Sequence, residues 1–252
     1  IRMNNIVIDE FIEDKQGWFC DRAFKSGDYT YQLNWHGQII FKTKEELKIT
    51  YNSYNAKYLV FQKGLYRVLT NLCGKILFKK KCDELIYLED DFFKFKVGNL
   101  WGLMYKDGFV MIKPKYQEIL LGRIDAKNHY RRTFYAKLND KFGIIDNCDE
   151  VIIPFLYDEI KITNSHYSED YIVKQNGKYG IINDKAEIVL PIKYTYVEET
   201  YYRKSYIVQN NEQECKYFID KKENVILDNK YFDIVDLTAH RPFAPGDYFV
   251  KN

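Results

Sequence analysis

The stretch KYGII at residues 178–182 decides the fold, because related stretches recur at regular distances along the chain. KFGII stands at 141–145 and LWGLM at 100–104, and the residues that flank the three stretches align as well. A repeat this short cannot bury its own apolar face and gains a core only by packing against its neighbours. The 252 residues are therefore expected to form a single repeat domain.

The period of the repeat can be measured from the residue that closes each unit. The closing aromatics, separated by 41, 37 and 37 residues, are Tyr116, Tyr157, Tyr194 and Tyr231, and Cys82 holds the same place upstream. A turn residue or its substitute lies eight residues earlier, at Gly74, Gly108, Asp149, Ala186 and Glu223, with Gly37 one unit before them. These spacings predict six units at 18–55, 56–91, 92–132, 133–169, 170–204 and 205–246, with partial strands at 1–17 and 247–252.

Within a unit the pattern is typical of short β-strands. In residues 170–204, Tyr171 opens a β-branched run that ends at the turn signal QNGK. We predict further strands at 179–183, 187–190 and 194–198, and we expect Pro191 to end the third because proline lacks the donor that a strand ladder needs. Phe93 and Phe134 open earlier units at the same distance from the central glycine. No segment keeps a helical apolar period, so helix should be scarce.

These units resemble the WG repeats (KWG type) of a largely bacterial group of proteins. The matching residues are 101–103 with 112–116, 178–182 with 190–194, and 142–146 with 153–154 and 157–158. The resemblance extends from about residue 92 to 200, and only Trp101 keeps tryptophan in the signature dipeptide. It implies a repeat scaffold for binding, with no catalytic residues to carry over.

The fold class that follows is all-β, with six short antiparallel meanders arranged as a propeller-like ring; an open β-repeat array is the alternative. The two ends of the chain favour the ring. Residues 247–252 copy 170–175, the first strand of a unit, and residues 6–10 resemble a later strand. A sheet built from both ends would remove the exposed edges of an open array.

Composition narrows the class of partner and the compartment. The net charge is +2, from 38 basic and 36 acidic residues, which is no global electrostatic footprint for nucleic acid. Five scattered cysteines without C-x-x-C spacing favour a reducing compartment, so we expect a cytoplasmic protein. Cys82 occupies a slot that is Tyr elsewhere and is expected to be a small buried hydrophobe. No apolar run approaches membrane-spanning length, and no membrane association is predicted.

Metal and cofactor sites are not predicted. His129, His166 and His240 fall in connectors between strands, but Arg203 and Asp91 occupy the same slot in other units. A metal site needs several ligands converging at one point, and side chains in separate units do not supply them. The recurring carboxylate pair Asp158–Glu159 is interpreted as part of the turn geometry of the repeat.

The connectors are the predicted binding surface. The connector 123–132 is four residues longer than its counterparts, and insertions in repeat proteins gather on the binding face. Tyrosine and arginine are enriched at the energetic centres of interfaces. The candidate contact residues are therefore Tyr130, Arg131 and Arg132 in this connector, with Tyr201, Tyr202 and Arg203 in a later one. A solvated loop is the competing interpretation of both segments.

No catalytic template occurs: the chain has no G-x-S-x-G, no H-E-x-x-H and no P-loop, so no enzyme is predicted. We expect a non-enzymatic scaffold that binds another macromolecule, a protein, through its connector loops. The alternative is a nucleic-acid binder, or an inhibitor of a nucleic-acid enzyme in a bacterial or phage defence context. The basic runs 79–81 and 221–222 fit that alternative, because lysines interleaved with tyrosines can contact phosphates and stack on bases. A ligand pocket in a central channel is a third possibility, and the oligomeric state stays open.

Overall fold

The computed structural model is all-β, as predicted. It describes residues 2–3, 6–13, 19–33, 38–45, 47–50, 58–63, 65–71, 75–124, 132–162, 170–200, 205–211, 216–227, 233–236 and 248–251. These ranges contain 28 strands and no helix. The chain divides into two compact units, unit 1 (Ile1–Leu121) and unit 2 (Gly122–Asn252), and each is considered by itself below.

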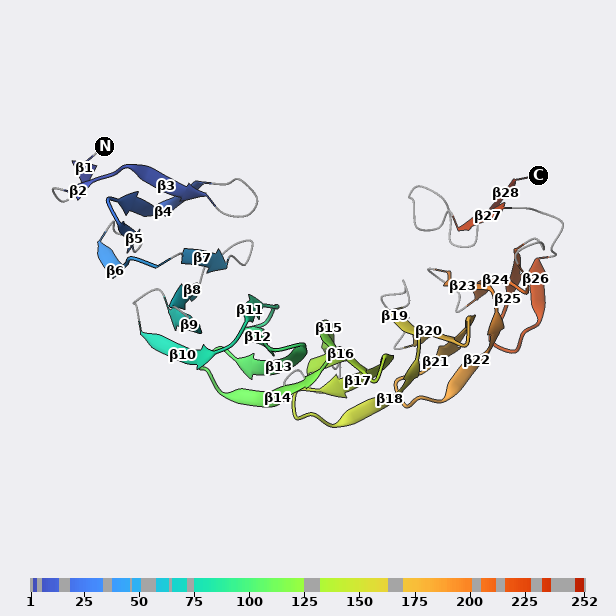
Figure 1. Ribbon diagram of the computed structural model, residues 1–252. Coiled ribbons are helices and arrows are strands. Elements are labelled where there is room, and N and C mark those ends of the chain that lie inside the picture. Colours follow the sequence, from blue (N-terminus) through green and yellow to red (C-terminus); the bar gives the residue numbers. More distant parts are fainter. Residues whose placement is uncertain are drawn as a thin grey trace. The chain divides into compact units, whose positions relative to one another are not determined.

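Unit 1 contains a short strand pair and three four-stranded sheets, in which neighbouring strands are antiparallel (Figure 1). The pair is β1 (Arg2–Met3) with β2 (Ile6–Val7). The first sheet has β3 (Glu10–Glu13), β4 (Phe19–Ser26), β5 (Tyr29–Leu33) and β6 (Ile39–Thr43). The second has β7 (Leu47–Thr50), β8 (Tyr58–Lys63), β9 (Tyr66–Asn71) and β10 (Ile76–Lys81). The third has β11 (Glu84–Tyr87), β12 (Phe92–Val97), β13 (Leu100–Tyr105) and β14 (Val110–Tyr116).

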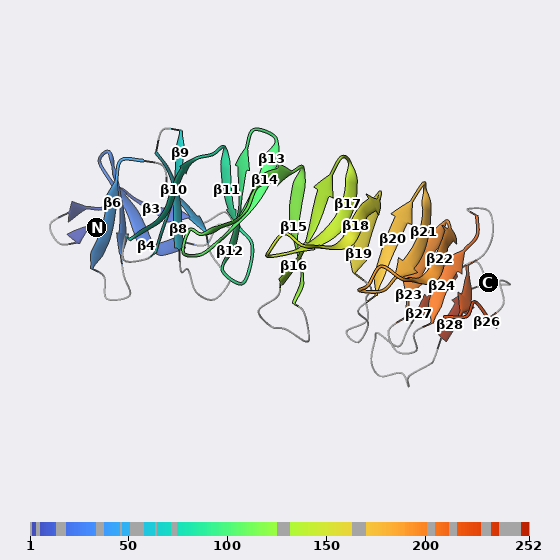
Figure 2. The same cartoon turned by 90° about the horizontal axis from the view of Figure 1, so that it is seen from below.

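Unit 2 repeats this plan, and its sheets are seen edge-on in Figure 2. Its first sheet has β15 (Glu118–Ile124, which begins before the boundary), β16 (Arg132–Leu138), β17 (Lys141–Asp146) and β18 (Val151–Tyr157). The next has β19 (Glu159–Ile162), β20 (Tyr171–Gln175), β21 (Lys178–Ile182) and β22 (Ile188–Tyr194). The third has β23 (Tyr196–Glu199), β24 (Tyr206–Gln209), β25 (Tyr217–Ile219) and β26 (Val225–Leu227), and β27 (Asp233–Asp236) pairs with β28 (Tyr248–Lys251).

The six sheets have the period of the predicted units but a different phase. Strands follow one another in chain order within each sheet, as in a simple meander. The strand after each closing tyrosine, such as β19 after Tyr157, is the first strand of the next sheet. A sheet therefore starts just after a closing residue, whereas the units defined from the sequence start at the opening aromatic.

In three units the central glycine is required by a bulge in the fourth strand. Trp101, Phe142 and Tyr179 on the third strands pair with the closing tyrosines on the fourth strands. A step of two residues along the third strand then corresponds to a step of four along the fourth, so the fourth strand is bulged in these three sheets. A Cβ on Gly143 would lie 2.7 Å from the carbonyl oxygen of Ile153. Gly102 and Gly180 meet equally close backbone atoms. Only glycine fits between the two strands at this point.

The prediction that Pro191 ends its strand is wrong, and the bulge explains why. Strand β22 continues through Pro191 to Tyr194; Pro154 lies at the same place in β18, and Pro114 lies one residue nearer the closing tyrosine in β14. A proline is tolerated in an edge strand or a bulge because no ladder hydrogen bond is lost there. The fourth strand is the edge of its sheet. Strand β22 therefore extends past the predicted strand 187–190, and only Thr195 separates it from β23, which covers most of the predicted strand 194–198.

The closing tyrosines have the same surroundings in successive sheets, as a repeat requires. Tyr116, Tyr157 and Tyr194 are all buried and each pairs with the signature aromatic of its own sheet. A lysine on the second strand lies over that aromatic, with Lys174 Nζ 4.9 Å from the Tyr179 ring centre. The equivalent pairs are Lys96 with Trp101 and Lys137 with Phe142. Any aromatic ring satisfies this packing, which explains why tryptophan is replaced in two of the three units.

The turn residues predicted from the spacing have left-handed backbones. Gly108, Asp149, Ala186 and Glu223 have φ values of 86°, 70°, 63° and 62°. Each follows a polar residue whose side chain organises the turn; the Asn183 carboxamide oxygen, for example, accepts from the amides of Lys185 and Glu187 at 3.0 and 2.9 Å. Gly74 lies outside the described residues.

Among the described residues, the two chain ends do not form the shared sheet that we predicted. Strands β1 and β2 form a two-stranded sheet of their own, and so do β27 and β28. The sequence copy at 247–252 was nevertheless informative: Tyr248–Lys251 forms a strand that pairs with the strand following Tyr231, just as Tyr171–Gln175 pairs with the strand following Tyr157.

Candidate functional site

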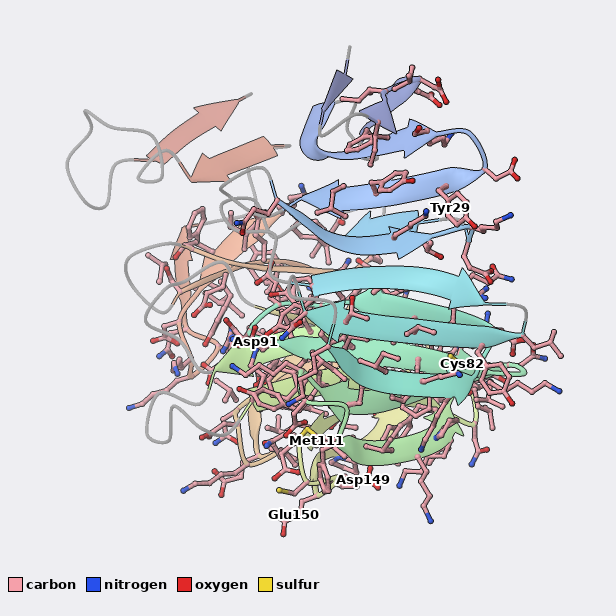
Figure 3. The ribbon with its side chains drawn as sticks, turned by 90° about the vertical axis from the view of Figure 1, so that its left-hand side faces the viewer. Tyr29, Cys82, Asp91, Met111, Asp149 and Glu150 are labelled. Carbon is pink, nitrogen blue, oxygen red and sulfur yellow. The ribbon has the colours of Figure 1, made fainter. Side chains whose placement is uncertain are left out.

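The two ends of each sheet differ in their links. At the hairpin end the second and third strands are joined by a tight hairpin, and at the connector end the first and second strands are joined by a connector. Figure 3 labels Cys82 and Tyr29 at the hairpin end of unit 1 and Asp91 at the connector end. Comparing the residues at the two ends distinguishes those that the fold requires from those that are available for binding.

The hairpin end is stabilised by an aspartate that recurs with the repeat. Asp9 Oδ2 accepts from the amide of Gly27 at 2.6 Å, and Asp83 Oδ2 accepts from Gly98 at 2.7 Å. Asp158 accepts from the hairpin amides of Asn176 and Gly177 and pairs with Lys141 Nζ at 2.5 Å, which holds the pKa of Asp158 below its ordinary value. The carboxylate beside the closing residue therefore serves turn geometry, as the sequence suggested.

The connector end of unit 1 holds a partly buried carboxylate, Asp91, between two sheets. Tyr58 of β8 donates its hydroxyl hydrogen to Asp91 Oδ1 at 2.9 Å, and Lys106 Nζ lies 2.8 Å from Oδ2. Burial and this hydrogen bond raise the pKa of Tyr58. The bond to Asp91 also raises the pKa of Lys106. The base of the connector before β12 is therefore fixed from two neighbouring sheets.

The connector end of unit 2 carries a larger set, the unit 2 polar cluster, made of Arg123, Tyr135, Asp170, Glu199, Tyr206 and Lys221. The Asp170 carboxylate is buried and lies 3.3 Å from Lys221 Nζ. Lys221 occupies the same turn position as Lys106 of unit 1. Arg123 donates from Nη2 to the Asp170 carbonyl oxygen at 3.2 Å, and its guanidinium lies 4.9 Å from the centre of the Tyr171 ring.

Two tyrosine hydroxyls are buried within this cluster. Tyr135 packs edge-on against the Tyr171 ring at 6.4 Å, and Tyr206 is fully buried at the start of β24. Neither hydroxyl makes a hydrogen bond with the residues that the structure describes. Burial raises the pKa of both, and the negative charges of Asp170 and Glu199 raise that of Tyr206 further. Both side chains therefore stay protonated and can donate at neutral pH.

Two members of the cluster, Glu199 and Tyr135, are polar where some other units have apolar residues, although Asp236 and Lys94 occupy the same positions in further units. Glu199 is 3% exposed, but the equivalent residues of the two preceding units are Leu121 and Ile162. Tyr135 stands where the two following units have Ile172 and Ile207. A buried carboxylate or hydroxyl is unfavourable unless it is paired, so the fold does not select it at these places. Such local violations of the folding pattern are typical of functional sites.

The connector after β23 is anchored beside the cluster. The Thr200 hydroxyl donates to the carbonyl oxygen of Ser205 at 3.1 Å and lies 2.6 Å from its hydroxyl oxygen. The Thr200 amide donates to the same carbonyl at 3.0 Å. Both residues are buried. These bonds hold together the two ends of residues 201–204.

Most of the predicted contact residues lie outside the described residues. These are Tyr130, Arg131, Tyr201, Tyr202 and Arg203. Arg132 is the first residue of β16, is half-buried, and accepts a backbone hydrogen bond from Asn147 at 3.1 Å. The sequence reasoning missed the unit 2 polar cluster, although the charged Glu199 in an apolar column was a usable signal.

Cysteines and acidic groups add little to the site. Cys82 is buried among apolar residues, as predicted, and burial raises its pKa to about 11. Within the described ranges no group of three histidine, cysteine or acidic residues could hold a metal ion, and the three connector histidines lie outside them. No helix long and apolar enough to cross a membrane occurs in the same part of the chain.

Solved structures share only a loose likeness with this chain. A eukaryotic initiation factor aligns over 89% of this chain and 66% of its own, at 10% identity and a TM-score of 0.39. Hsv2 from Kluyvelomyces marxianus aligns over 88% and 74%, at 8% identity and 0.37. PorZ from Porphyromonas gingivalis aligns over 82% and 30%, at 8% identity and 0.33. The chain thus spans less than two thirds of two of these proteins, and such scores carry no argument about function.

Sequence comparison is more specific. No curated protein matches the chain. The family model of the WG-containing repeat matches twice in succession, at residues 142–179 and 179–212. Each match begins at a signature aromatic and the glycine that the bulge requires, Phe142–Gly143 in the first and Tyr179–Gly180 in the second. Residues 142–212 of the chain are accordingly matched as two consecutive WG-containing repeats, both in unit 2.

Proposed function

We propose that this chain is a non-enzymatic scaffold that binds another protein through the connector ends of its sheets. The observation that carries the proposal is the unit 2 polar cluster: the residues that break the repeat gather where the connectors begin and end. The hairpin end, by contrast, repeats the same aspartate contact in the first, third and fifth four-stranded sheets. Residues that every unit shares serve the fold, and the unshared ones are free to serve recognition.

The cluster supports this role because it gives the connectors a rigid base. Asp170 is fixed by Lys221, and the Thr200–Ser205 bonds close the loop 201–204. A surface that is already ordered loses less conformational entropy when a partner binds. Aromatic and arginine side chains on such a base are the residue types that dominate binding energy at protein interfaces.

The state of the ionisable groups supports binding rather than catalysis. A general base must be deprotonated near neutral pH, whereas burial raises the pKa of Tyr135 and Tyr206. The Asp170 carboxylate pairs with Lys221, and such a pair suits fixed hydrogen-bond geometry. We also propose a cytoplasmic location, which the buried thiol of Cys82 and the unpaired Cys148 support.

The test is to isolate what binds the full chain from its native cells and to compare two variants. Tyr130→Ala with Arg131→Ala removes the predicted contacts, and Tyr135→Phe with Tyr206→Phe removes the two buried hydroxyls. We expect one protein partner whose affinity falls about tenfold or more in the first variant, as hot-spot truncation does. Asp184→Asn, in the turn between β21 and β22, is the control and should bind normally.

Nucleic acid is the outcome that would overturn this proposal. If the bound material is RNA or DNA, its affinity should fall steeply with salt, because phosphate contacts release counterions. Fluorescence anisotropy with a labelled oligonucleotide at two salt concentrations separates the cases. Salt-steep oligonucleotide binding, with no protein retained, would make the alternative function correct.

A further inference from the structure

The hairpin end of unit 1 exposes large apolar side chains on two neighbouring hairpins. Leu65 and Tyr66 follow the turn between β8 and β9, and their side chains are 67% and 46% exposed. Val97 and Leu100 flank the turn between β12 and β13 and are 47% and 38% exposed. We call these four residues the hairpin patch. They lie at the opposite end of the strands from the connectors and play no part in the function proposed above.

Asp83 brings the two hairpins together. Arg67, next to Tyr66, donates from Nη2 to the Asp83 carbonyl oxygen at 2.6 Å. The Asp83 carboxylate accepts from the amide of Gly98, between Val97 and Leu100, at 2.7 Å. Asp83 therefore contacts a residue of each hairpin, so the four apolar side chains lie at the same end of two neighbouring sheets. Cys82, labelled in Figure 3, precedes Asp83 and marks this end of the unit.

The hairpin patch is a departure from the repeat. The position of Leu65 and Leu100 is occupied in unit 2 by Lys141 and Lys178. Lysine at a hairpin tip keeps the surface solvated, and Lys141 also pairs with Asp158. Leucine at the same tip makes no such contact and leaves apolar area in water. Contiguous apolar surface of this kind marks an interaction site.

Basic side chains border the patch. Lys79, Lys80 and Lys81 are exposed on β10, the strand that pairs with the Tyr66 end of β9, and Lys79 Nζ lies 5.6 Å from the Tyr66 ring centre. The nearby carboxylates are engaged, since Asp83 binds the hairpin amide and Glu84 pairs with Lys96 at 3.0 Å. The surface around the apolar side chains is therefore positively charged.

We propose that the hairpin patch binds a protein segment that carries aliphatic side chains beside aspartate or glutamate. The aliphatic groups would cover Leu65, Tyr66, Val97 and Leu100, and the carboxylates would pair with the lysines of β10. Charge complementarity of this kind selects the partner and speeds association, while the apolar contacts supply most of the affinity. The scaffold then has a second binding surface, distinct from its connectors.

The experiment selects random peptides displayed on phage against the full chain and, in parallel, against the Leu65→Ser/Leu100→Ser variant. We expect peptides enriched only on the unaltered chain to combine leucine, isoleucine or valine with acidic residues. A synthetic peptide of that sequence should bind the variant about tenfold more weakly or worse. It should also bind Lys79→Glu/Lys81→Glu more weakly, with a loss that grows as salt is lowered.

Three controls keep the outcome decisive. Ile188→Ser changes an exposed apolar residue of unit 2 and should leave peptide binding unaltered. Tyr130→Ala/Arg131→Ala, which tests the connector function, should leave it unaltered too. The proposal is overturned if no peptide distinguishes the chain from the variant, or if the selected peptides lack acidic residues. It is also overturned if the same substitutions instead abolish binding to anionic phospholipid vesicles or to an oligonucleotide.

Discussion

The glycine of the signature dipeptide shows how one residue sets the geometry of a whole sheet. Gly102, Gly143 and Gly180 have no Cβ, so the bulged fourth strand can approach the third strand closely. The aromatic residue before each glycine then pairs with the closing tyrosine. Aromatic identity is flexible in this arrangement, but the glycine is required by space. The glycine rather than the tryptophan is thus the stricter part of the motif.

Replacing Gly143 with alanine should destabilise the protein by about 3 kcal/mol, because overpacking at a site bounded by backbone cannot relax. The new Cβ would meet the Ile153 carbonyl oxygen at 2.7 Å and the Phe155 ring at 2.9 Å. Gly177→Ala is the matched control, with free space around it but a φ of 78°, and should lose only about 1 kcal/mol. Urea unfolding measures both, and equal losses would contradict the role given to the bulge.

Ala186 occupies a backbone position whose conformation would suit glycine better. Its φ of 63° is left-handed, a conformation that costs a non-glycine residue about 1 kcal/mol. The Ala186→Gly variant should therefore be more stable by about 0.5–1 kcal/mol in urea unfolding. Ala136→Gly, at a fully buried strand position, should instead be destabilised by a similar amount. Loss of stability in both variants would show that the Ala186 methyl group matters more than its backbone.

At the scale of the element, the hairpins of the first, third and fifth four-stranded sheets are each tied by a single carboxylate that lies just before the first strand of the sheet. Asp158 receives amide hydrogens from the hairpin between β20 and β21 and pairs with Lys141 of β17. It therefore joins two successive sheets of unit 2 at the hairpin end. The same contact at Asp9 and Asp83 makes it a general device of this repeat.

This device predicts a pH dependence. The pKa of Asp158 is held below 3.8 by Lys141 and the hairpin amides, so its contribution to stability is complete above pH 3.8 and is lost as the pH falls through the lowered pKa. The Asp158→Asn variant should melt at a lower temperature than the wild type at pH 7, and the difference should shrink below pH 3.8. Asp184→Asn, whose carboxylate makes no contact with the described residues, is the control. A difference between Asp158→Asn and wild type that stays constant with pH would exclude the charge as the cause.

Strands were predictable from sequence, but their grouping into sheets was not. Strands β20, β21 and β23 lie within two residues of the ranges expected from the β-branched runs and turn signals. Tyr157 marks the period correctly because the closing tyrosine is buried in its own and the neighbouring units. Periodicity alone, however, cannot tell on which side of Tyr157 a sheet ends. Pro191 was misjudged because an edge strand does not need its amide donor, and edge status is a property of the sheet.

For the whole molecule, the sequence predicted the repeat better than it predicted the departures from it. Repeated residues such as Gly143 and Asp158 reinforce one another, so a pattern search finds them. The unit 2 polar cluster is assembled from single residues, among them Arg123, Glu199 and Lys221, that are far apart in the sequence. Their proximity follows only from the stacking of sheets, and no one spacing encodes it. The cluster could therefore be identified only from the structure.

This contrast predicts a conflict between stability and binding at Glu199. A buried carboxylate must give up its hydration, and replacing buried charged groups together with their partners by apolar side chains is often stabilising. The Glu199→Leu variant restores the residue found at the equivalent Leu121 and should be more stable by about 1–2 kcal/mol, while binding the connector partner more weakly. Glu199→Gln keeps the shape without the charge and should lie between the two in both measurements. Paired urea unfolding and partner titration provide the check. If Glu199→Leu were less stable and bound normally, the carboxylate would belong to the fold, and the repeat-breaking residues would no longer identify the binding face.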